Sequence, residues 1–421
     1  MPGSSADVPR LVEHLFRRHA AVMVARLVRV LGPGNLGLAE EVVQDALLKA
    51  LDIWPMRGIP DDPTAWLTRV ARNRAVDLVR HEASLRARAN ALAASLPDAP
   101  GGEEQLGDDV LAMSFLCCHP VISSDSRVAL TLKAVCGLGV GEISRAFLAD
   151  ETAVAQRLAR AKRRIRERAI AFELPSPSEL PARLESVLEV IYLLFNEGYT
   201  AYAGKNLIRA ELCEEAAWLG RLVTEHPETD LPQSHALLSL MLLKTARQPA
   251  RVDRRGELVL LPDQDRTLWD RRLIDAGLRH LERASEGSLV SRYQLEAAIA
   301  AHHVIPQTYE DTDWPEIVRL YDDLLSLDRS PVVALNRAIA LSRGLGPRAG
   351  IEALREVEQD STLRRYHLLP ATLGRLWEEA GDLRQAADHY RAALDLPCSD
   401  PERRLLTRWL TEVIGQPERS R

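Results

Sequence analysis

Residues 151–168 have the sequence ETAVAQRLARAKRRIRER, in which apolar and basic positions repeat with the period of an α-helix. One face of this helix would carry Val154, Leu158, Ala161 and Ile165. Seven basic residues lie between positions 157 and 168, against the single acid Glu167. A helix that packs on one side and presents guanidinium groups on the other can enter a major groove, although most charged faces are only solvated. We therefore interpret this stretch as a DNA-binding helix, with Thr152 as its predicted N-cap.

Two shorter apolar-periodic segments precede this helix. The first runs through Val128, Leu132 and Val135, and the second spans residues 142–148. Three helices in such close succession predict a helix-turn-helix. The exposed face of its last helix would carry Ala153, Gln156, Arg157, Arg160, Arg163 and Arg164.

The composition predicts an all-α protein with more than one domain. A chain of 421 residues is too long for a single core, and it is rich in the helix-forming residues Leu, Ala, Arg and Glu. The net charge of −6 hides an asymmetry, because residues 1–172 have an excess of basic side chains and residues 173–421 a large excess of acidic ones. The two halves should therefore have different partners.

Neither the start MPGSSADVPR nor any apolar stretch has the features of a targeting or membrane-spanning segment. We therefore expect a cytoplasmic protein without membrane contact. Five cysteines in a long chain do not indicate a disulfide framework. We also expect no catalytic site, no bound metal and no cofactor, because no phosphate loop, nucleophile elbow or zinc-protease motif is present.

Breaks rich in Pro, Gly and acidic residues divide the chain into predicted domains. They are a helical domain at 8–90, a flexible acidic linker at 91–108, the helix-turn-helix domain at 109–172 and a large helical domain at 182–421. In the last domain, Gly346 and Gly381 lie 35 residues apart between similar apolar segments. This spacing is typical of tetratricopeptide-like helical hairpins, although ordinary helical hairpins would give it too.

Two further motifs carry a family resemblance. Residues 39–51 read AEEVVQDALLKAL, and residues 63–80 read PTAWLTRVARNRAVDLVR. Together with the helix-turn-helix, they resemble regions 2 and 4 of the extracytoplasmic-function sigma factors of bacterial RNA polymerase, over residues 8–172. The resemblance implies two small helical sigma domains that bind core polymerase and promoter DNA. It also implies functional roles for three groups of residues.

The first group would bind core polymerase, with the β′ clamp helices and the β subunit as partners. It consists of Glu41, Gln44, Asp45 and Lys49. The second group would hold the downstream (−10) promoter element as a single strand, and consists of Trp66, Arg69, Arg72, Asn73, Arg74 and Arg80. The third would read the upstream (−35) element as duplex, and consists of Thr152, Ala153, Gln156, Arg157, Arg160, Arg163 and Arg164. Arg163, Arg164 and Lys162 would contact phosphates, and Trp66 is better explained as a core residue than as a stacking platform.

The acidic linker invites a separate hypothesis. Its carboxylates, from Asp98 to Asp109, would occupy the basic RNA path of the polymerase as a nucleic-acid mimic.

We expect the helix that begins at Pro63 to be capped by Asp62.

The second half of the chain resembles one subgroup of these sigma factors, which carries a long tetratricopeptide-like C-terminal extension. The segments that show this are 195–201 (FNEGYTA), 260–270 (LLPDQDRTLWD), 293–301 (YQLEAAIAA) and 330–338 (SPVVALNRA). The resemblance implies that the extension modulates activity, either through contact with the basic helix or through an unknown protein partner. The alternative function is a stand-alone helix-turn-helix regulator with a helical solenoid sensor domain.

Three local patterns have competing explanations. Cys117, Cys118 and His119 would bind zinc or sense oxidants, but packed cysteines are the favoured explanation. Asp263, Asp265 and Asp270 are spaced like a carboxylate cluster. His302 and His303 are adjacent, and adjacent side chains on a helix point apart, which argues against a shared metal site.

Overall fold

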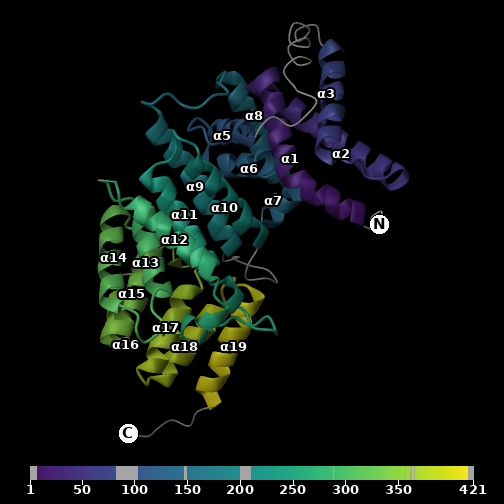
Figure 1. Ribbon diagram of the computed structural model, residues 1–421. Coiled ribbons are helices and arrows are strands. Elements are labelled where there is room, and N and C mark those ends of the chain that lie inside the picture. The colour runs from purple at the N-terminus through teal and green to yellow at the C-terminus, as the bar shows by residue number, and fades with distance from the viewer. Residues whose placement is uncertain are drawn as a thin grey trace. The chain divides into compact units, whose positions relative to one another are not determined.

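The computed structural model describes residues 7–81, 103–146, 149–199, 210–287, 289–355, 357–360, 363–364 and 366–415 (Figure 1). These residues form helices and connecting segments, and their only β-type pairing is an isolated bridge between Val252 and Leu258. The predicted all-α fold class is therefore confirmed. The chain divides into two compact units, residues 1–193 (unit 1) and 194–421 (unit 2).

Unit 1 is built from α-helices around a 3-10 turn. They are α1 (Asp7–Leu31), η1 (Pro33–Asn35), α2 (Leu36–Arg57), α3 (Pro63–His81), α5 (Glu103–Cys117), α6 (Ser124–Ala134), α7 (Val140–Ala146), α8 (Glu151–Glu167) and the first part of α9 (Leu180–Tyr199). Helix α1 contacts α2 and α3, which form the first helical group of the unit. It also contacts α5 and α6, which belong with α7 and α8 to the second helical group. The fully buried side chains of unit 1 include Leu27, Trp54, Leu67 and Phe115.

Helix α3 begins as its sequence predicts. The carboxylate of Asp62 accepts a hydrogen bond of 2.8 Å from the backbone N–H of Ala65, and Pro63 occupies the first helical position. Leu67, Ala71 and Ala75 of this helix are buried, and Leu78 is half-buried.

The end of the predicted linker differs from the expectation. Helix α5 begins at Glu103, so residues 103–108 are helical instead of forming a flexible tether; residues 91–102 lie outside the described residues. The carboxylate of Asp109 lies 2.5 Å from Arg29 Nε and 3.7 Å from Arg26 Nε. Asp109 is 3% exposed. The nucleic-acid-mimic hypothesis is therefore wrong for Asp109, because its buried carboxylate pairs with Arg26 and Arg29.

The first part of α9 is fastened to the rest of unit 1. A guanidinium N–H of Arg183 donates to the backbone carbonyl of Phe115 at 2.8 Å, and Arg127 lies 3.4 Å from Glu189. Helix α9 begins at Leu180, close to the boundary predicted at residue 182, but its residues up to Leu193 belong to unit 1.

Unit 2 is a series of helices in which consecutive members pack on each other. They are α10 (Ala210–Glu225), α11 (Pro232–Thr245), α12 (Arg271–Ala284), α13 (Arg292–Val304), α14 (Trp314–Leu327), α15 (Pro331–Leu345), α16 (Pro347–Leu354), α17 (Leu368–Glu379), α18 (Leu383–Leu394) and α19 (Asp400–Gly415). Short 3-10 turns at Leu261–Asp263 (η3) and Arg266–Leu268 (η4) lie between α11 and α12.

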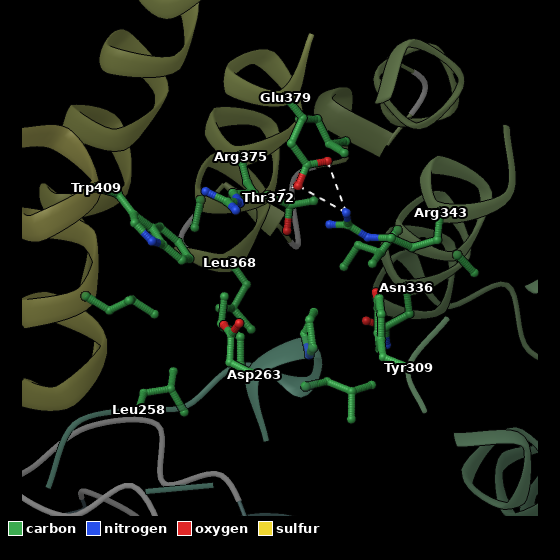
Figure 2. Close-up of a pocket in the computed structure, with 18 of the residues that line it drawn as sticks. Leu258, Asp263, Tyr309, Asn336, Arg343, Leu368, Thr372, Arg375, Glu379 and Trp409 are labelled. Carbon is green, nitrogen blue, oxygen red and sulfur yellow. Dashed lines mark hydrogen bonds and ion pairs between the residues drawn. The ribbon is translucent and has the colours of Figure 1, made fainter. Parts of the chain in front are cut away.

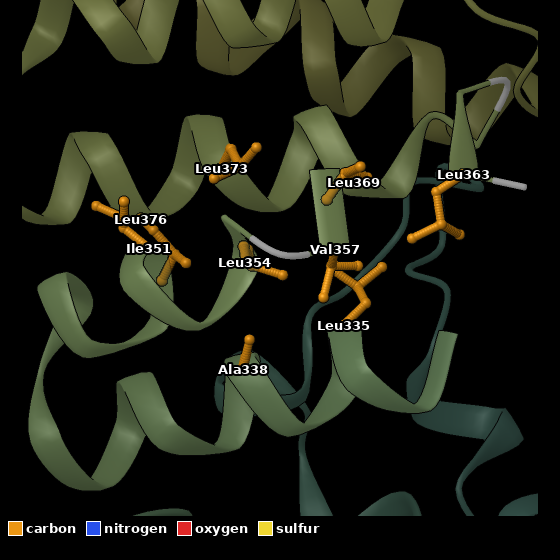
Figure 3. Packing of buried hydrophobic residues seen from close by; sticks show 9 residues of the cluster. All are labelled: Leu335, Ala338, Ile351, Leu354, Val357, Leu363, Leu369, Leu373 and Leu376. Carbon is orange, nitrogen blue, oxygen red and sulfur yellow. The ribbon is translucent and has the colours of Figure 1, made fainter. Parts of the chain in front are cut away.

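The helical hairpins expected around Gly346 and Gly381 are present. Gly346 separates α15 from α16 with φ of 92°, and Gly381 lies between α17 and α18 with φ of 85°; such left-handed conformations favour glycine. The apolar sides of α15, α16 and α17 meet in one core (Figure 3). That core contains Leu335, Ala338, Ile351, Leu354, Val357, Leu363, Leu369, Leu373 and Leu376.

Within the described ranges, no helix has the length and apolar character needed to cross a membrane.

Candidate nucleic-acid interface

Helix α8 is held as the last helix of a helix-turn-helix. It packs on α6 and α7, and its buried side chains are Val154, Leu158, Ala161 and Ile165. The inward face is therefore the one that the apolar period predicts. Helix α7 begins at Val140 instead of Glu142, and residues 147–148 lie outside the described ranges.

The N-cap of α8 is Asp150, so the prediction that Thr152 caps this helix is wrong. The carboxylate of Asp150 accepts a hydrogen bond of 2.7 Å from the backbone N–H of Thr152. This hydrogen bonding lowers the pKa of Asp150. The helix thus begins at Glu151, one residue before Thr152, and the Thr152 side chain is exposed.

The outer face of α8 carries the predicted basic residues. Gln156, Arg160, Arg163 and Arg164 are exposed, and Ala153 is half-buried. Arg157 is also half-buried, and its guanidinium lies 3.6 Å from the carboxylate of Asp125 on α6. Partly exposed pairs of this kind contribute only about 0–1 kcal/mol, so this contact leaves Arg157 available to another anion.

The flank of α8 next to this face contacts the other helical group of unit 1. Lys162 forms an ion pair with Glu40 on α2, and α8 packs against η1. A Cβ on Gly34 of η1 would lie 3.5 Å from Arg166 Cγ. Lys162 is therefore engaged inside unit 1, contrary to the expectation that it contacts phosphate.

Helix α3 presents a second basic surface. Arg69, Asn73 and Arg74 are exposed, and Arg72 is half-buried. Trp66 is half-buried and meets Trp54 edge to face, with ring centroids 5.5 Å apart, which favours the packing role. The side chain of Arg80 lies outside the described residues.

Two residues assigned to different partners contact each other. Arg74 Nε donates to the carboxylate of Asp45 at 2.8 Å, so the predicted DNA surface on α3 and the predicted polymerase surface on α2 adjoin. The other polymerase candidates on α2, Glu41, Gln44 and Lys49, are exposed.

Helix α2 also carries exposed apolar residues, which the sequence motifs do not indicate. Leu48 is 52% exposed and Met56 79% exposed, and Leu51 is also exposed. No local signal marked Leu48 as exposed, because adjacent apolar residues of α2 such as Val42 and Val43 are both buried. The surface of α2 therefore combines charged, amide and apolar groups, a mixture typical of protein interfaces.

The cysteines beside the helix-turn-helix are packed. Cys117 and Cys118 are buried, as the favoured explanation expects, and Cys118 Sγ lies 3.4 Å from Thr131 Oγ1. Burial raises the pKa of the Cys117 thiol and raises that of Cys118 to about 11. Within the described ranges, no group of three or more His, Cys, Asp or Glu side chains could hold a metal ion.

We expect the thiols of the folded chain to be unreactive. All five thiols are buried, and burial raises the pKa of Cys118 and Cys213 to about 11, whereas only an accessible thiolate attacks a disulfide reagent. Ellman's reagent should therefore modify none of the five cysteines within minutes, and all of them in guanidinium chloride. Rapid modification of Cys117 or Cys118 in the folded chain would contradict the packing role.

The carboxylates of residues 263–270 do not form one cluster. Asp265 caps η4 through the backbone N–H of Thr267, and Asp270 caps α12 through those of Arg272 and Leu273. Asp263 instead lines a cavity in unit 2.

Comparison with known proteins agrees with this arrangement. The chain matches sigma-70 region 2 over residues 15–84 and sigma-70 region 4 over residues 112–165. Residues 183–285 match a family of unknown function, DUF6596. An uncharacterized protein of Rhizobium meliloti (strain 1021) is 38% identical over 394 residues, which cover 91% of this chain and 92% of that protein.

The two matches fall on the two helical groups of unit 1. The first covers α2 and α3, and the second covers α6, α7 and most of α8. The protein therefore belongs to the sigma-70 family, as a sigma factor of the extracytoplasmic-function type with a helical C-terminal extension, and it directs promoter-specific transcription initiation.

Proposed function

We propose that α8 reads the upstream (−35) promoter element as duplex. Its basic outer face can enter the major groove while its apolar side stays packed on α6 and α7. The residues assigned to this contact are Thr152, Ala153, Gln156, Arg157, Arg160, Arg163 and Arg164. Those nearest Asp150 would lie at the bases, and Arg163 and Arg164 would contact phosphates.

The second DNA surface is on α3 and would hold the downstream (−10) element as a single strand. Its exposed Arg69, Asn73 and Arg74 offer the charge and hydrogen-bond donors that unpaired bases and their phosphates require. Trp66, Arg72 and Arg80 complete the proposed set. Binding there would replace the partly exposed pair between Arg74 and Asp45, which costs only about 0–1 kcal/mol.

Core polymerase would bind on α2. Glu41, Gln44, Asp45 and Lys49 suit the basic β′ clamp helices, and the β subunit would supply a further contact. The exposed Leu48, Leu51 and Met56 would be desolvated in the same interface.

Unit 2 would modulate this activity. Its hairpins are tetratricopeptide-like in the spacing of Gly346 and Gly381, and its acidic composition suits contact with the basic helix α8 or with a separate protein. Because core polymerase and promoter DNA are the proposed partners, we propose that the protein acts in the cytoplasm.

The observation that carries the residue assignments is the pair of exposed basic faces, on α3 and α8, within one compact unit. The experiment is run-off transcription from genomic DNA with core polymerase and the purified chain, followed by mapping of the start sites. Discrete start sites that require the chain are expected. A chain that binds DNA fragments without core polymerase and yields no transcripts would support the stand-alone regulator.

The same assay tests unit 2. Truncation after Tyr199 retains Arg183 and Glu189, which fasten α9 to unit 1, whereas truncation at residue 176 would remove them. A rise in transcripts from the truncated chain would indicate inhibition by unit 2, and a fall would indicate that it is required. Equal output from both chains would remove the modulating role.

We expect Leu48→Lys to weaken core-polymerase binding by about tenfold or more, because a buried interface would have to accept an unpaired charge. Titration of labelled core polymerase measures the affinity. The control is Leu327→Lys, since Leu327 on α14 is similarly exposed, at 55% against 52% for Leu48. Equal affinities for the two variants would place the polymerase contact elsewhere.

A further inference from the structure

Unit 2 contains a cavity of about 460 Å³ that the sigma-factor activity does not use. This volume lies within the range of small-molecule sites. The cavity is lined from segments far apart in the sequence: the 258–263 segment, α13 to α15, α17 and α19. Its walls are mainly apolar and aromatic, with Tyr309, Trp314, Tyr321 and Trp409 supplying rings.

The positive charges of the cavity are already neutralised. Arg343 Nη1 lies 3.0 and 3.1 Å from the two carboxylate oxygens of Glu379. Arg375 lies 3.4 Å from Glu379 and 3.2 Å from Glu378, and its guanidinium is 5.6 Å from the ring centre of Trp409. Figure 2 shows Arg343, Arg375 and Glu379 at one end of the cavity. An anionic ligand would therefore have to compete with two carboxylates for both guanidinium groups.

Two further carboxylates line the cavity, those of Asp263 and Glu402, and Glu402 lies against His367. The side chain of Asp263 is exposed to solvent at the edge of the cavity, has no hydrogen-bond or ion-pair partner among the described residues, and lies across the cavity from Glu379 (Figure 2). Trp409 and Tyr309 lie on either side. A carboxylate beside aromatic ring faces is the arrangement that attracts organic cations.

Two histidines add unused hydrogen-bonding atoms. Burial, helped by Arg247 and Arg266, lowers the pKa of His303 to about 3, so its ring is neutral; its Nδ1 is buried without a partner in the described part of the chain. The Nδ1 of His367, a residue only 3% exposed, is in the same situation. Its Nε2 lies 3.3 Å from Glu402. Buried polar atoms normally have partners, and both histidines line the cavity, so a ligand with a hydrogen-bonding group could supply a missing partner.

We propose that this cavity binds a small amphipathic organic cation, an amine carried on an aromatic or apolar body. The ammonium group would pair with Asp263, and the body would lie between Trp409 and Tyr309.

Three probes of one shape and different charge test the class of ligand. They are tryptamine, tryptophol and indole acetate, titrated into the full chain by isothermal calorimetry. Tryptamine is expected to bind about tenfold or more tightly than tryptophol, and indole acetate to show no binding, because only the ammonium group forms a charge-assisted hydrogen bond with Asp263. Phenethylamine serves as a second cation with a smaller ring.

Two variants locate the site. Asp263→Asn should weaken tryptamine binding by about tenfold or more while leaving tryptophol unchanged. Asp275→Asn is the matched control, since Asp275 is an exposed carboxylate on α12 away from the cavity. Asn336→Trp, at an exposed lining residue of α15, should abolish binding of every probe by filling the cavity, with the fold checked by circular dichroism.

Several results would overturn the proposal. They are binding of indole acetate as tight as that of tryptamine, failure of both amines to bind at millimolar concentration, and unchanged tryptamine binding in Asp263→Asn. The measurement needs neither polymerase nor promoter. Its failure would therefore leave the assignments on α2, α3 and α8 untouched.

Discussion

Replacing Asp109 by alanine is expected to lower the free energy of unfolding of unit 1 by about 3–5 kcal/mol. The side chains of Asp109 and Arg26 are 5% and 9% exposed, so the variant leaves a guanidinium buried beside no carboxylate. Burial lowers the pKa of Arg26, and the nearby carboxylate of Asp109 opposes that shift. Urea unfolding of the full chain, followed by circular dichroism, measures the loss.

The neighbouring Asp108→Ala is the control, because Asp108 is exposed and its loss should cost well below 1 kcal/mol. The double variant Arg26→Met with Asp109→Leu should recover much of the stability, since it removes both buried charges together. If Asp109→Ala and Asp108→Ala unfold at the same urea concentration, the ion pair does not stabilise the unit.

Replacing Arg160 by alanine is expected to weaken holoenzyme binding to the −35 element by about 1–3 kcal/mol, or about 5- to 150-fold in affinity. Arg160 is exposed on the outer face of α8, one turn beyond the half-buried Arg157. Its long side chain can therefore reach bases without breaking a packed contact. Competition binding of holoenzyme to a promoter found by run-off transcription measures the change.

Two comparisons make this result specific to α8. Arg391→Ala removes an exposed helical arginine from α18 in unit 2 and should leave promoter affinity unchanged. Base changes across the −35 element should matter less to Arg160→Ala than to the parent chain if the guanidinium reads a base. Undiminished affinity would remove Arg160 from the interface, and an equal loss on every sequence would make it a phosphate contact.

The local features of this sigma factor were predictable because they depend on residues close in the sequence. The period of Val154, Leu158, Ala161 and Ile165 correctly gave the buried side of α8, and the Asp62-Pro63 pair correctly gave the start of α3. The cap of α8 was misassigned because Asp150 and Thr152 are both good capping residues two positions apart. The non-enzymatic function of a sigma-70 protein followed from the same motifs.

Features that join distant residues left no local signal. Asp109 was assigned to the linker by its acidic surroundings, whereas its partner Arg29 lies 80 residues away in the sequence. Lys162 and Glu40 are 122 residues apart. The cavity in unit 2 draws side chains from residue 258 to residue 409, so its charge balance could be worked out only after folding.

The burial of every native cysteine has a practical consequence. A thiol introduced at an exposed position would be the single fast-reacting group of the chain, so fluorophores or spin labels could be attached without first removing native residues. A pair of such labels, one on α3 and one on α8, would report their separation in solution while the promoter opens. A change in that separation would show whether the contact between Lys162 of α8 and Glu40 of α2 persists during initiation.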